Sequence, residues 1–280
     1  MSNPTLVLCH IGTPVPAHIK TCIEQIRRFS DIPIHLIAEE CPVDTDNFTF
    51  IPLHALDKHF MVRAMKKLPF KQDEPNPLWR AAALRFAYIA ASADEHDYEE
   101  IIHFDNDVLV YKDPLELLPE LARGNDISIT ECNDELLIAG FMYMRDYRTA
   151  MWLCQALHGQ MELVDDNEMR LLRLIADDYP NYFSFLPMLP TMDRAAEFEG
   201  VFDCASWGQY VGGTHQEPGV AWAGDHHIVG RAITSGQVSV EWEDDEEGRS
   251  VPVCVTRKGD RHRIFNLHIH SKELDKYATQ

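Results

Sequence analysis

The amino-acid sequence predicts an α/β protein with a central, mostly parallel sheet flanked by helices, followed by a mixed C-terminal part. Two observations support this prediction. The chain opens with an apolar strand, an amphipathic helix and a second apolar strand, an order typical of a parallel strand pair. Strand and helix patterns then alternate for about 180 residues before the pattern becomes mixed.

The opening unit occupies the first 37 residues. Residues 5–9 form a short apolar run that is typical of a buried strand, and a turn rich in glycine and proline follows at residues 12–16. Apolar residues then recur at helical spacing over residues 19–29, and residues 32–37 form a second apolar run. We therefore expect a strand, a helix and a parallel strand over these ranges.

The alanine-rich residues 78–93 indicate a long helix after a less regular stretch at residues 41–76. An aspartate that can cap a helix leads each of two later helical patterns. The remaining expected strands cover residues 100–104, 126–130 and 139–144, and the remaining expected helices cover residues 146–157 and 165–176.

The last third of the chain is richer in glycine and aromatic residues. Residues 238–242 and 251–256 are expected to form a hairpin around an acidic run at residues 243–247, which we expect to be a solvated turn. Residues 263–270 indicate a final strand. No internal repeat and no long linker divides the chain, so we expect one domain over residues 1–280.

Composition excludes several classes of function. The chain has 280 residues and a formal net charge of −20, so a general surface for nucleic acid or anionic membranes is not expected. No run of about 18 apolar residues is present that would predict a membrane-spanning helix. An anionic substrate would need positive charge supplied locally by the site that binds it.

The seven cysteines are scattered along the chain and form no C-x-x-C pair. This distribution argues against a disulfide scaffold or a zinc ribbon and favours reduced thiols. The first residues also lack the basic and long apolar regions of a secretory signal. We therefore expect a cytoplasmic protein.

The first chemical motif is Asp105-Asn106-Asp107, which directly follows an apolar strand. Carboxylates at the carboxyl end of a buried strand can bind Mg²⁺ or Mn²⁺, and these cations in turn bridge phosphate oxygens. A second triplet, Asp44-Thr45-Asp46, follows a proline in a polar loop and is expected to be a solvated turn. The sequence therefore predicts a metal site at residues 105–107.

A second motif lies near the end of the chain. Asn266, His268 and His270 alternate, so they share one face of the predicted strand. Two imidazoles and an amide can complete a metal shell, and Lys272 can neutralise a diphosphate oxygen. Arg85, on the helix before the aspartate pair, is expected to reach a phosphate or one of the aspartates.

A third motif is the glycine-punctuated stretch at residues 202–213. Glycines permit a close approach of backbone to ligand, and Asp203, Gln209 and Tyr210 are side chains of the kind that bind sugars. Read alone, the stretch is equally typical of a loop with aromatic packing around Trp207.

Taken in order, these motifs resemble those of GT-A glycosyltransferases, which act on nucleotide sugars and have a Rossmann-like sheet. The helix LWRAAALRFAYIA, the strand EEIIHFDNDVLVYKDP, the segment AGFMYMRD and the ending HIHSK stand in the order of that family. FDCASWGQYVGG is similar to the stretch F-D-G-A-x-x-G-Q-Y-x-G-G of some transferase-like proteins, and departs from it at Cys204, where glycine is expected.

The resemblance implies roles for individual residues. Asp107 would bind Mn²⁺ or Mg²⁺, Asp105 would contact the metal or the donor, and either His268 or His270 would be a further metal ligand. Lys272 would bind the diphosphate, and Arg85 and Gln209 would help to hold the donor, by default a UDP-sugar.

The resemblance also implies an acceptor hydroxyl on a glycan, a lipid-linked glycan or a protein. Asp203 is the expected acceptor-binding residue or general base, with Glu135 as the second choice. A base is required only if the transferase inverts the anomeric carbon, and both stereochemical outcomes remain open at this point.

Two alternatives to a metal-dependent hexosyltransferase remain. A nucleotidyltransferase could be built on a similar sheet, although the turn at residues 12–16 has none of the basic residues that such enzymes usually carry after the first strand. A non-catalytic sugar-binding or interaction protein could retain the fold, although loss of the aspartate pair or of Lys272 would be expected in that case.

Overall fold

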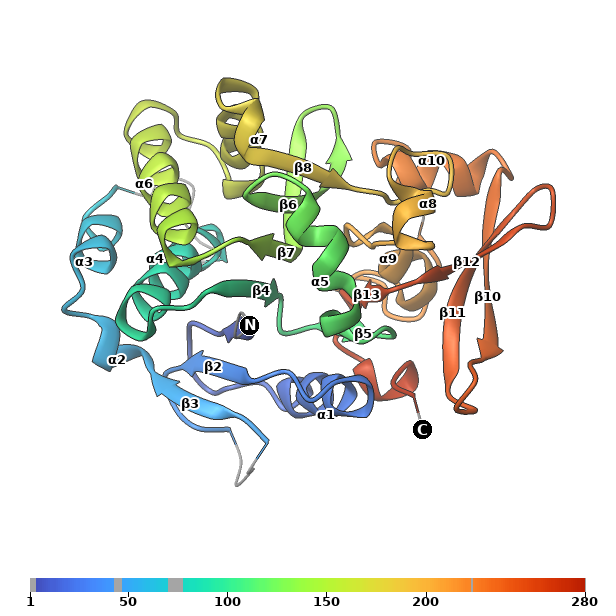
Figure 1. Ribbon diagram of the computed structural model, residues 1–280, viewed down its shortest axis with the longest axis horizontal. Helices are drawn as coiled ribbons and strands as arrows, with labels where there is room; N and C mark the ends of the chain where they lie inside the picture. The colour runs from blue at the N-terminus through green and yellow to red at the C-terminus, as the bar shows by residue number, and fades with distance from the viewer. Residues whose placement is uncertain (1–3, 43–46, 70–77, 223, 280) are drawn as a thin grey trace.

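The computed structural model describes residues 4–42, 47–69, 78–222 and 224–279 (Figure 1). Within these ranges, seven strands form the central sheet in the order β3-β2-β1-β4-β7-β6-β8. The strands are β1 (Pro4–Cys9), β2 (Ile34–Ala38), β3 (Thr49–Pro52), β4 (Glu100–Phe104), β6 (Ile127–Asn133), β7 (Leu136–Met144) and β8 (Phe183–Leu186). The second aspartate triplet, at residues 44–46, lies outside the described residues.

Most neighbouring strands of this sheet run parallel. The exception is β7, which pairs antiparallel with β4 on one side and with β6 on the other. The pairs β1–β2, β1–β4, β2–β3 and β6–β8 are parallel. The expected α/β class with a mostly parallel sheet is therefore confirmed.

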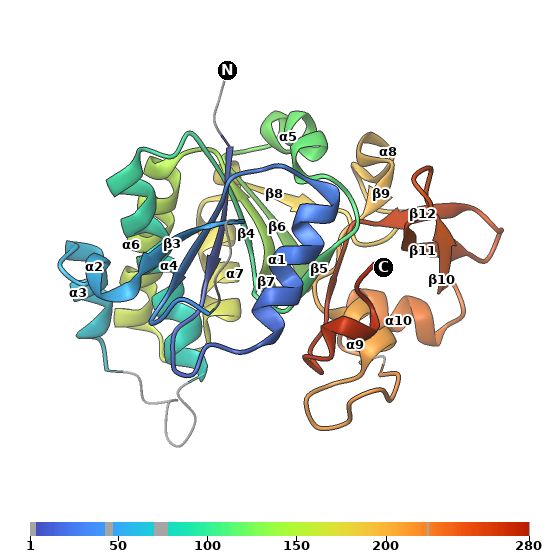
Figure 2. The same cartoon turned by 90° about the horizontal axis from the view of Figure 1, so that it is seen from below.

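Helices cover both faces of the sheet because β1 is apolar on both sides. Leu6 and Leu8 pack in the core under α1 (His18–Phe29), whereas Val7 and Cys9 pack in the core under α4 (Leu78–His96). Figure 2 shows α1 and α4 on opposite sides of the sheet.

The other helices are α2 (Leu53–Leu56), α3 (Phe60–Lys66), α5 (Pro114–Arg123), α6 (Tyr147–Leu163), α7 (Glu168–Asp178), η2 (Pro180–Tyr182), α8 (Ala195–Phe198), α9 (Ser206–Gly212), α10 (Ile228–Thr234) and η3 (Leu274–Lys276).

The C-terminal part contains a four-stranded sheet in the order β10-β11-β12-β9 and a two-stranded sheet of β13 and β5. The predicted hairpin is present as β10 and β11. The single strand expected at residues 263–270 is wrong. Two short strands, β12 in the four-stranded sheet and β13 in the two-stranded sheet, are separated at Phe265, and β13 ends at His268. The strands are β5 (Val108–Val110), β9 (Gly200–Val201), β10 (Val238–Asp244), β11 (Ser250–Thr256), β12 (Arg261–Ile264) and β13 (Asn266–His268).

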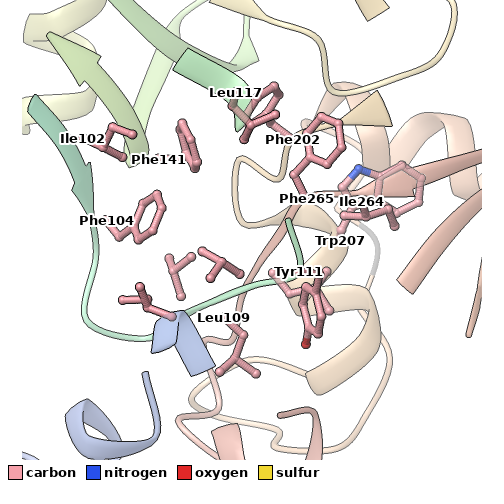
Figure 3. Packing of buried hydrophobic residues seen from close by; sticks show 14 of the residues in the cluster. Ile102, Phe104, Leu109, Tyr111, Leu117, Phe141, Phe202, Trp207, Ile264 and Phe265 are labelled. Atoms are coloured by element: carbon pink, nitrogen blue, oxygen red, sulfur yellow. The ribbon is translucent and has the colours of Figure 1, made fainter. Parts of the chain in front are cut away.

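A continuous aromatic cluster joins the central sheet to the C-terminal part (Figure 3). The ring centroids of Phe104 and Phe141 are 4.8 Å apart, and those of Phe141 and Phe202 are also 4.8 Å apart. Phe202 in turn lies 5.1 Å from Phe265, between β12 and β13. The central sheet and the C-terminal part therefore share one hydrophobic core, and the single domain over residues 1–280 stays a prediction.

Two local expectations need correction. The cap of α7 is Asn167, whose side chain accepts the Arg170 backbone N–H at 3.0 Å, and not Asp165, because the helix begins three residues later than expected. Residues 206–212 of the expected glycine-punctuated loop form α9. The left-handed backbone there falls at Ala205, with φ of 93°, and not at Cys204, where the resembling stretch has glycine.

By contrast, Asp146 does cap α6, as expected. None of the helices in the described parts of the chain combines the length and the apolar character that a membrane crossing needs.

Candidate functional site

The aspartate pair lies where β4 leaves the central sheet. Asp105 follows the last residue of β4, and Asp107 directly precedes β5. Because β5 pairs antiparallel with β13, His268 lies opposite Val108, and the backbone N–H of Ile269 donates to the Asp107 carbonyl at 2.9 Å. Strand pairing therefore brings the two predicted motifs, far apart in sequence, to the same place.

Asp105, Asp107 and His268 form a cluster of three side chains that could hold a metal ion, with one potential ligand atom of each within 4.8 Å of the others. The Nε2 atom of His268 lies 3.0 Å from Asp107 Oδ1 and 3.9 Å from Asp105 Oδ2. The other ring nitrogen, Nδ1, is buried without a hydrogen-bond partner in the described residues. Nε2 is therefore the ring nitrogen of His268 that faces the two carboxylates.

Three neighbouring side chains, Arg85, His268 and Lys272, hold the carboxylates in their ionised form. Although burial raises the pKa of Asp105, the Arg85 guanidinium lies in contact with this carboxylate and holds its pKa well below the usual range. Although burial also raises the pKa of Asp107, His268 and Lys272 hold it well below the usual range, and the Lys272 ammonium contacts the carboxylate. Both aspartates thus present negative charge to a cation.

The donor set fits a divalent metal. Two carboxylates and one imidazole, aimed at a common point, are ligands that a first-row divalent cation accepts. Mg²⁺ prefers oxygen ligands alone, so the imidazole favours Mn²⁺ over Mg²⁺. Asp105, Asp107 and His268 are the residues that would hold the ion, and His270 is not part of this cluster.

The cluster forms part of the wall of a cavity of about 380 Å³. This volume lies within the range of small-molecule sites, roughly 300–1,000 Å³. Charged groups occupy one part of the lining, around the aspartate pair, Arg85 and Lys272. An apolar part comes from α4 and its surroundings and comprises Leu78, Trp79, Ala81, Ala82, Ile138 and Met169.

Glu168 lines the same cavity and was not predicted as a site residue. Its Oε1 atom lies 3.7 Å from Arg85 Nη2, whereas its buried Oε2 atom has no hydrogen-bond partner in the described residues. Burial raises the pKa of Glu168, and Arg85 opposes that shift. In the sequence, Glu168 is indistinguishable from the acidic residues that commonly begin helices; only the packing of α7 directs it into the cavity.

Asn106, the middle residue of the motif, lies between two histidines of the cavity lining. Its side-chain amide nitrogen lies 3.1 Å from His10 Nδ1, and its Oδ1 atom lies 3.3 Å from His18 Nε2. Burial lowers the pKa of both histidines. One consistent arrangement has His18 donating to Asn106 and Asn106 donating to His10, which leaves both rings neutral.

His270 lines the cavity, and its ring is in contact with the side-chain amide of Gln209. The amide nitrogen of Gln209 lies 2.6 Å from His270 Nδ1, and the His215 ring stacks on the His270 ring with centroids 5.5 Å apart. Burial and the nearby His268 lower the pKa of His270 to about 3. Gln209 itself is not among the described residues that line the cavity.

Asp203 is fully buried and is not among the lining residues either. Its Oδ2 atom accepts the backbone N–H groups of Gly208 at 2.8 Å and of His268 at 2.9 Å. Its Oδ1 atom accepts the Trp207 N–H at 2.8 Å. Burial raises the pKa of Asp203, and these N–H donors oppose the shift. The structure thus brings Asp203 to the backbone of His268 and not to the cavity.

Glu135, the second choice for a base, lies in the turn between β6 and β7. Its side chain is 72% exposed and pairs with Arg170 at 3.0 Å. Glu135 is also absent from the cavity lining. Neither of the two carboxylates expected to act as a base therefore lines the cavity.

Two glycines create the space that His268 occupies. A Cβ atom at Gly140, in the predicted segment AGFMYMRD, would lie 2.7 Å from His268 Nδ1. A Cβ atom at Gly208 would lie 2.0 Å from the His268 carbonyl oxygen. The close approach of these two glycines fixes the imidazole and its backbone from opposite elements, β7 and α9.

Comparison with solved structures finds glycosyltransferases. Mouse xyloside xylosyltransferase 1 matches 69% of this chain and 91% of its own at 15% identity, with a TM-score of 0.48. Glycosyltransferase GlyE of Streptococcus pneumoniae matches 71% of this chain and 47% of its own at 14% identity, with a TM-score of 0.43. The bifunctional glycosyltransferase WbbM matches 66% and 39% at 14% identity, with a TM-score of 0.43.

The chain therefore spans less than half of the matched GlyE and WbbM chains. No protein-family model and no curated protein sequence matches it. At these identities and TM-scores we draw no inference about activity from the structural similarities.

Proposed function

We propose that this chain is a metal-dependent glycosyltransferase that moves a sugar, by default a hexose, from a UDP-sugar to a hydroxyl acceptor. One observation carries the proposal: the Asp105–Asp107–His268 cluster lies beside Lys272 and Arg85 in a cavity at the carboxyl end of β4. Two ionised carboxylates, one imidazole and two cations are the groups needed to bind a divalent metal together with a diphosphate.

The charges around the cluster suit a diphosphate leaving group. A bound divalent ion would neutralise the negative charge that develops on the diphosphate. Lys272 can turn from Asp107 to a phosphate oxygen, because its ammonium is partly exposed and sits on a flexible stem. Arg85 is held between Asp105 and Glu168, so it positions carboxylates and presents a fixed positive charge to the cavity.

We assign Glu168 to the substrate hydroxyl in place of Asp203 and Glu135. Among the described lining residues, it is the carboxylate that does not belong to the metal cluster. Its buried and unpartnered Oε2 atom can accept a hydrogen bond from a sugar or acceptor hydroxyl. If the product has the inverted anomeric configuration, Glu168 removes the proton; if configuration is retained, Glu168 orients the hydroxyl.

The apolar part of the lining marks the side from which we propose the acceptor enters. One face of α4 carries Leu78, Ala81 or Ala82, and Arg85. It runs from the exposed first turn to the partly buried guanidinium. This face is about 10 Å long, at 1.5 Å per helical residue. An acceptor sugar can lie along it with its apolar ring face against Ala81 and Ala82.

The two alternatives have less support. Residues 10–16, which follow β1, contain no lysine or arginine to hold the triphosphate of a nucleotidyltransferase substrate. A protein that only binds sugar does not need two ionised carboxylates and an imidazole gathered at one point. Neither alternative therefore accounts for the whole group of residues.

Titration calorimetry with UDP and a panel of UDP-sugars, in Mn²⁺ and then in EDTA, tests the proposal. Because the net charge of −20 repels a nucleotide diphosphate, we expect binding in Mn²⁺ and little binding in EDTA. Asp107→Asn should weaken Mn²⁺ binding by more than about 100-fold, since loss of even an outer-shell partner weakens binding about 10–100-fold. The exposed neighbour of Glu135 gives the control variant, Asp134→Asn. Equal nucleotide affinity in Mn²⁺ and in EDTA would contradict the proposal.

Glu168→Gln tests the substrate carboxylate. It should leave Mn²⁺ and UDP binding intact and lower the transfer rate by about 100-fold, the lower range of a general base. Release of UDP from the UDP-sugar measures transfer, and the anomeric proton of the product measures stereochemistry. An unchanged rate would remove Glu168 from this role.

A further inference from the structure

A second cavity, of about 430 Å³, lies between the β10–β11 hairpin and the C-terminal segment. It shares no described lining residue with the cavity that contains the aspartate pair. The hairpin contributes one wall and residues 276–278 contribute the other. The lining residues are Trp242, Asp244, Gly248, Ser250, Lys276, Tyr277 and Ala278.

Trp242 is the largest side chain of this cavity, and it is 39% exposed. Its ring stands edge-to-face against Tyr111, with centroids 5.7 Å apart and planes at 78°. The Tyr111 hydroxyl donates to the Tyr277 carbonyl at 2.8 Å, which ties the opposite wall to the same aromatic pair. The indole is thus held in place from one side while part of its surface faces the cavity, and such a ring can stack on an apolar ligand face.

Polar side chains surround the exposed indole. Asp244 lies two residues after Trp242 on the same face of β10, and it pairs across the hairpin with Ser250. The Asp244 carboxylate has no ion pair or hydrogen bond in the described part of the chain. A carboxylate, a hydroxyl and an ammonium beside an aromatic ring can bind the hydroxyl groups of a ring whose C–H face lies on the indole.

The charges of the hairpin turn select against an anion. The expected solvated turn is exposed at Glu243, Asp244, Glu246 and Glu247, and Asp245 is only partly exposed. Three of its carboxylates pair with arginines, whereas Asp244 lines the cavity. Glu243 pairs with Arg261, and Asp245 and Glu247 pair with Arg249. Lys276 shares its charge with Glu273 at 2.8 Å. With Asp244 uncompensated, a nucleotide or phosphate would be repelled, whereas an uncharged polyhydroxylated ring would not.

We propose that this second cavity binds a neutral carbohydrate, with one sugar ring stacked on Trp242 and its hydroxyl groups bound by Asp244 and Ser250. This inference goes beyond the proposed transferase activity, because carbohydrate binding here needs neither metal nor nucleotide. A glycosyltransferase whose acceptor is a glycan would use such a subsite to hold the chain away from the reacting end.

The indole N–H resonances of a ¹⁵N-labelled protein distinguish the two cavities. Trp79 lines the first cavity and Trp242 lines the second, so each reports on its own site. The probes are glucose, galactose, mannose and xylose, and the linear trisaccharides maltotriose, cellotriose and xylotriose. We expect at least one saccharide to shift the Trp242 resonance in the presence of EDTA. UDP should shift the Trp79 resonance when Mg²⁺, at a concentration that saturates the site, replaces the paramagnetic Mn²⁺.

Variants locate the carbohydrate on the hairpin. Trp242→Ala and Asp244→Asn should each weaken saccharide binding by about tenfold, equivalent to about 1.4 kcal/mol, and Trp242→Phe should weaken it less because an aromatic face remains. Glu246→Gln in the same turn, outside the cavity lining, is the matched control and should bind as the wild type does. Asp244→Asn changes only an exposed side chain, so it reports on binding even if Trp242→Ala does not fold.

Two results would overturn the proposal. One is that no saccharide of the panel shifts the Trp242 resonance, and the other is that both hairpin variants bind saccharide with wild-type affinity. Either result leaves the UDP titration intact, so failure of this inference is distinguishable from failure of the proposed function. A loss of UDP binding with an unchanged Trp242 response would contradict only the transferase proposal.

Discussion

The carboxylate of Asp203 accepts the backbone N–H of His268 at 2.9 Å, and this bond joins the segment before α9 to β13 next to the imidazole that could bind a metal. The same oxygen accepts the Gly208 N–H at 2.8 Å. A buried carboxylate that satisfies backbone groups around a ligand positions that ligand without touching substrate. We therefore propose a positioning role for Asp203, in place of the role of catalytic base expected from the sequence.

Replacement of Asp203 by asparagine should weaken both folding and metal binding. An amide has one acceptor oxygen, so at least one of the three N–H groups bound by Asp203 loses its partner, which lowers the free energy of unfolding by about 1–3 kcal/mol. Displacement of His268 should weaken Mn²⁺ binding by about 10–100-fold. Chemical denaturation and calorimetry measure the two effects. Normal stability and metal affinity combined with lost transfer would restore Asp203 as the base.

Gly208→Ala should destabilise the protein, because the added Cβ would lie 2.0 Å from the His268 carbonyl oxygen. Overpacking of this kind typically lowers the free energy of unfolding by about 1–3 kcal/mol. Gly159→Ala on α6 is the matched control, since no atom lies within 4 Å of its added Cβ. The control should raise stability by up to about 1 kcal/mol, the helix preference of alanine. Thermal unfolding of both variants measures these changes. A Gly208→Ala variant as stable as the wild type would contradict the close packing of Gly208 against His268.

Glu135→Gln should leave transfer unchanged. The carboxylate is 72% exposed and its ion pair with Arg170 lies at the surface, so loss of the pair changes stability by less than about 1 kcal/mol. Release of UDP should continue at the wild-type rate, in contrast to Glu168→Gln. A larger rate loss for Glu135→Gln than for Glu168→Gln would reverse the assignment of the substrate carboxylate.

The ionised carboxylate of Asp245 should contribute to the free energy of unfolding, and this contribution should be lost at acidic pH. Although burial raises its pKa, hydrogen bonds from Arg249 and from the backbone of the turn lower it from 3.8 to about 2. Because the folded pKa is the lower one, this stability is fully present above pH 3.8 and is lost as the pH falls through 2.

Arg249, the partner of Asp245, also contacts α1. Its guanidinium lies 4.0 Å from the Phe29 ring centroid and donates to the Arg28 carbonyl. Asp245→Asn should therefore lower stability at pH 7 by about 1–3 kcal/mol, the effect of leaving charged partners unsatisfied, and should flatten the loss of stability between pH 4 and pH 2. Denaturation at several pH values measures the difference, with Glu246→Gln as the exposed control. Parallel pH profiles for wild type and Asp245→Asn would contradict this role.

Local pattern was sufficient for β1, α1, β2, α4 and β4 in the first half of the chain, but it did not predict β3, α2, α3, β5 or α5. The apolar runs before and after α1 and the alanine-rich α4 bury their side chains against near neighbours, so their periodicity in sequence reports their packing. The sequence also singled out Asp105 and Asp107 as candidate metal ligands, because a pair of carboxylates after a buried strand is itself a chemical signal. The end of the chain was less predictable, since β12 and β13 change sheets at Phe265 through pairing with distant partners.

The sequence by itself thus determined the α/β class, the aspartate pair and the set of histidines, because residue type and short-range spacing decide helix periodicity, strand burial and ligand chemistry. Only the tertiary structure decided that His268 lies beside the aspartates, that Glu168 lines the cavity and that the Asp203 carboxylate accepts backbone N–H groups. Those choices depend on the pairing of β5 with β13 and on the packing of α7 and α9, which bring together residues far apart in sequence. For a side chain such as Asp203 or Glu168, chemistry depends on burial and partners, and these exist only in the folded chain.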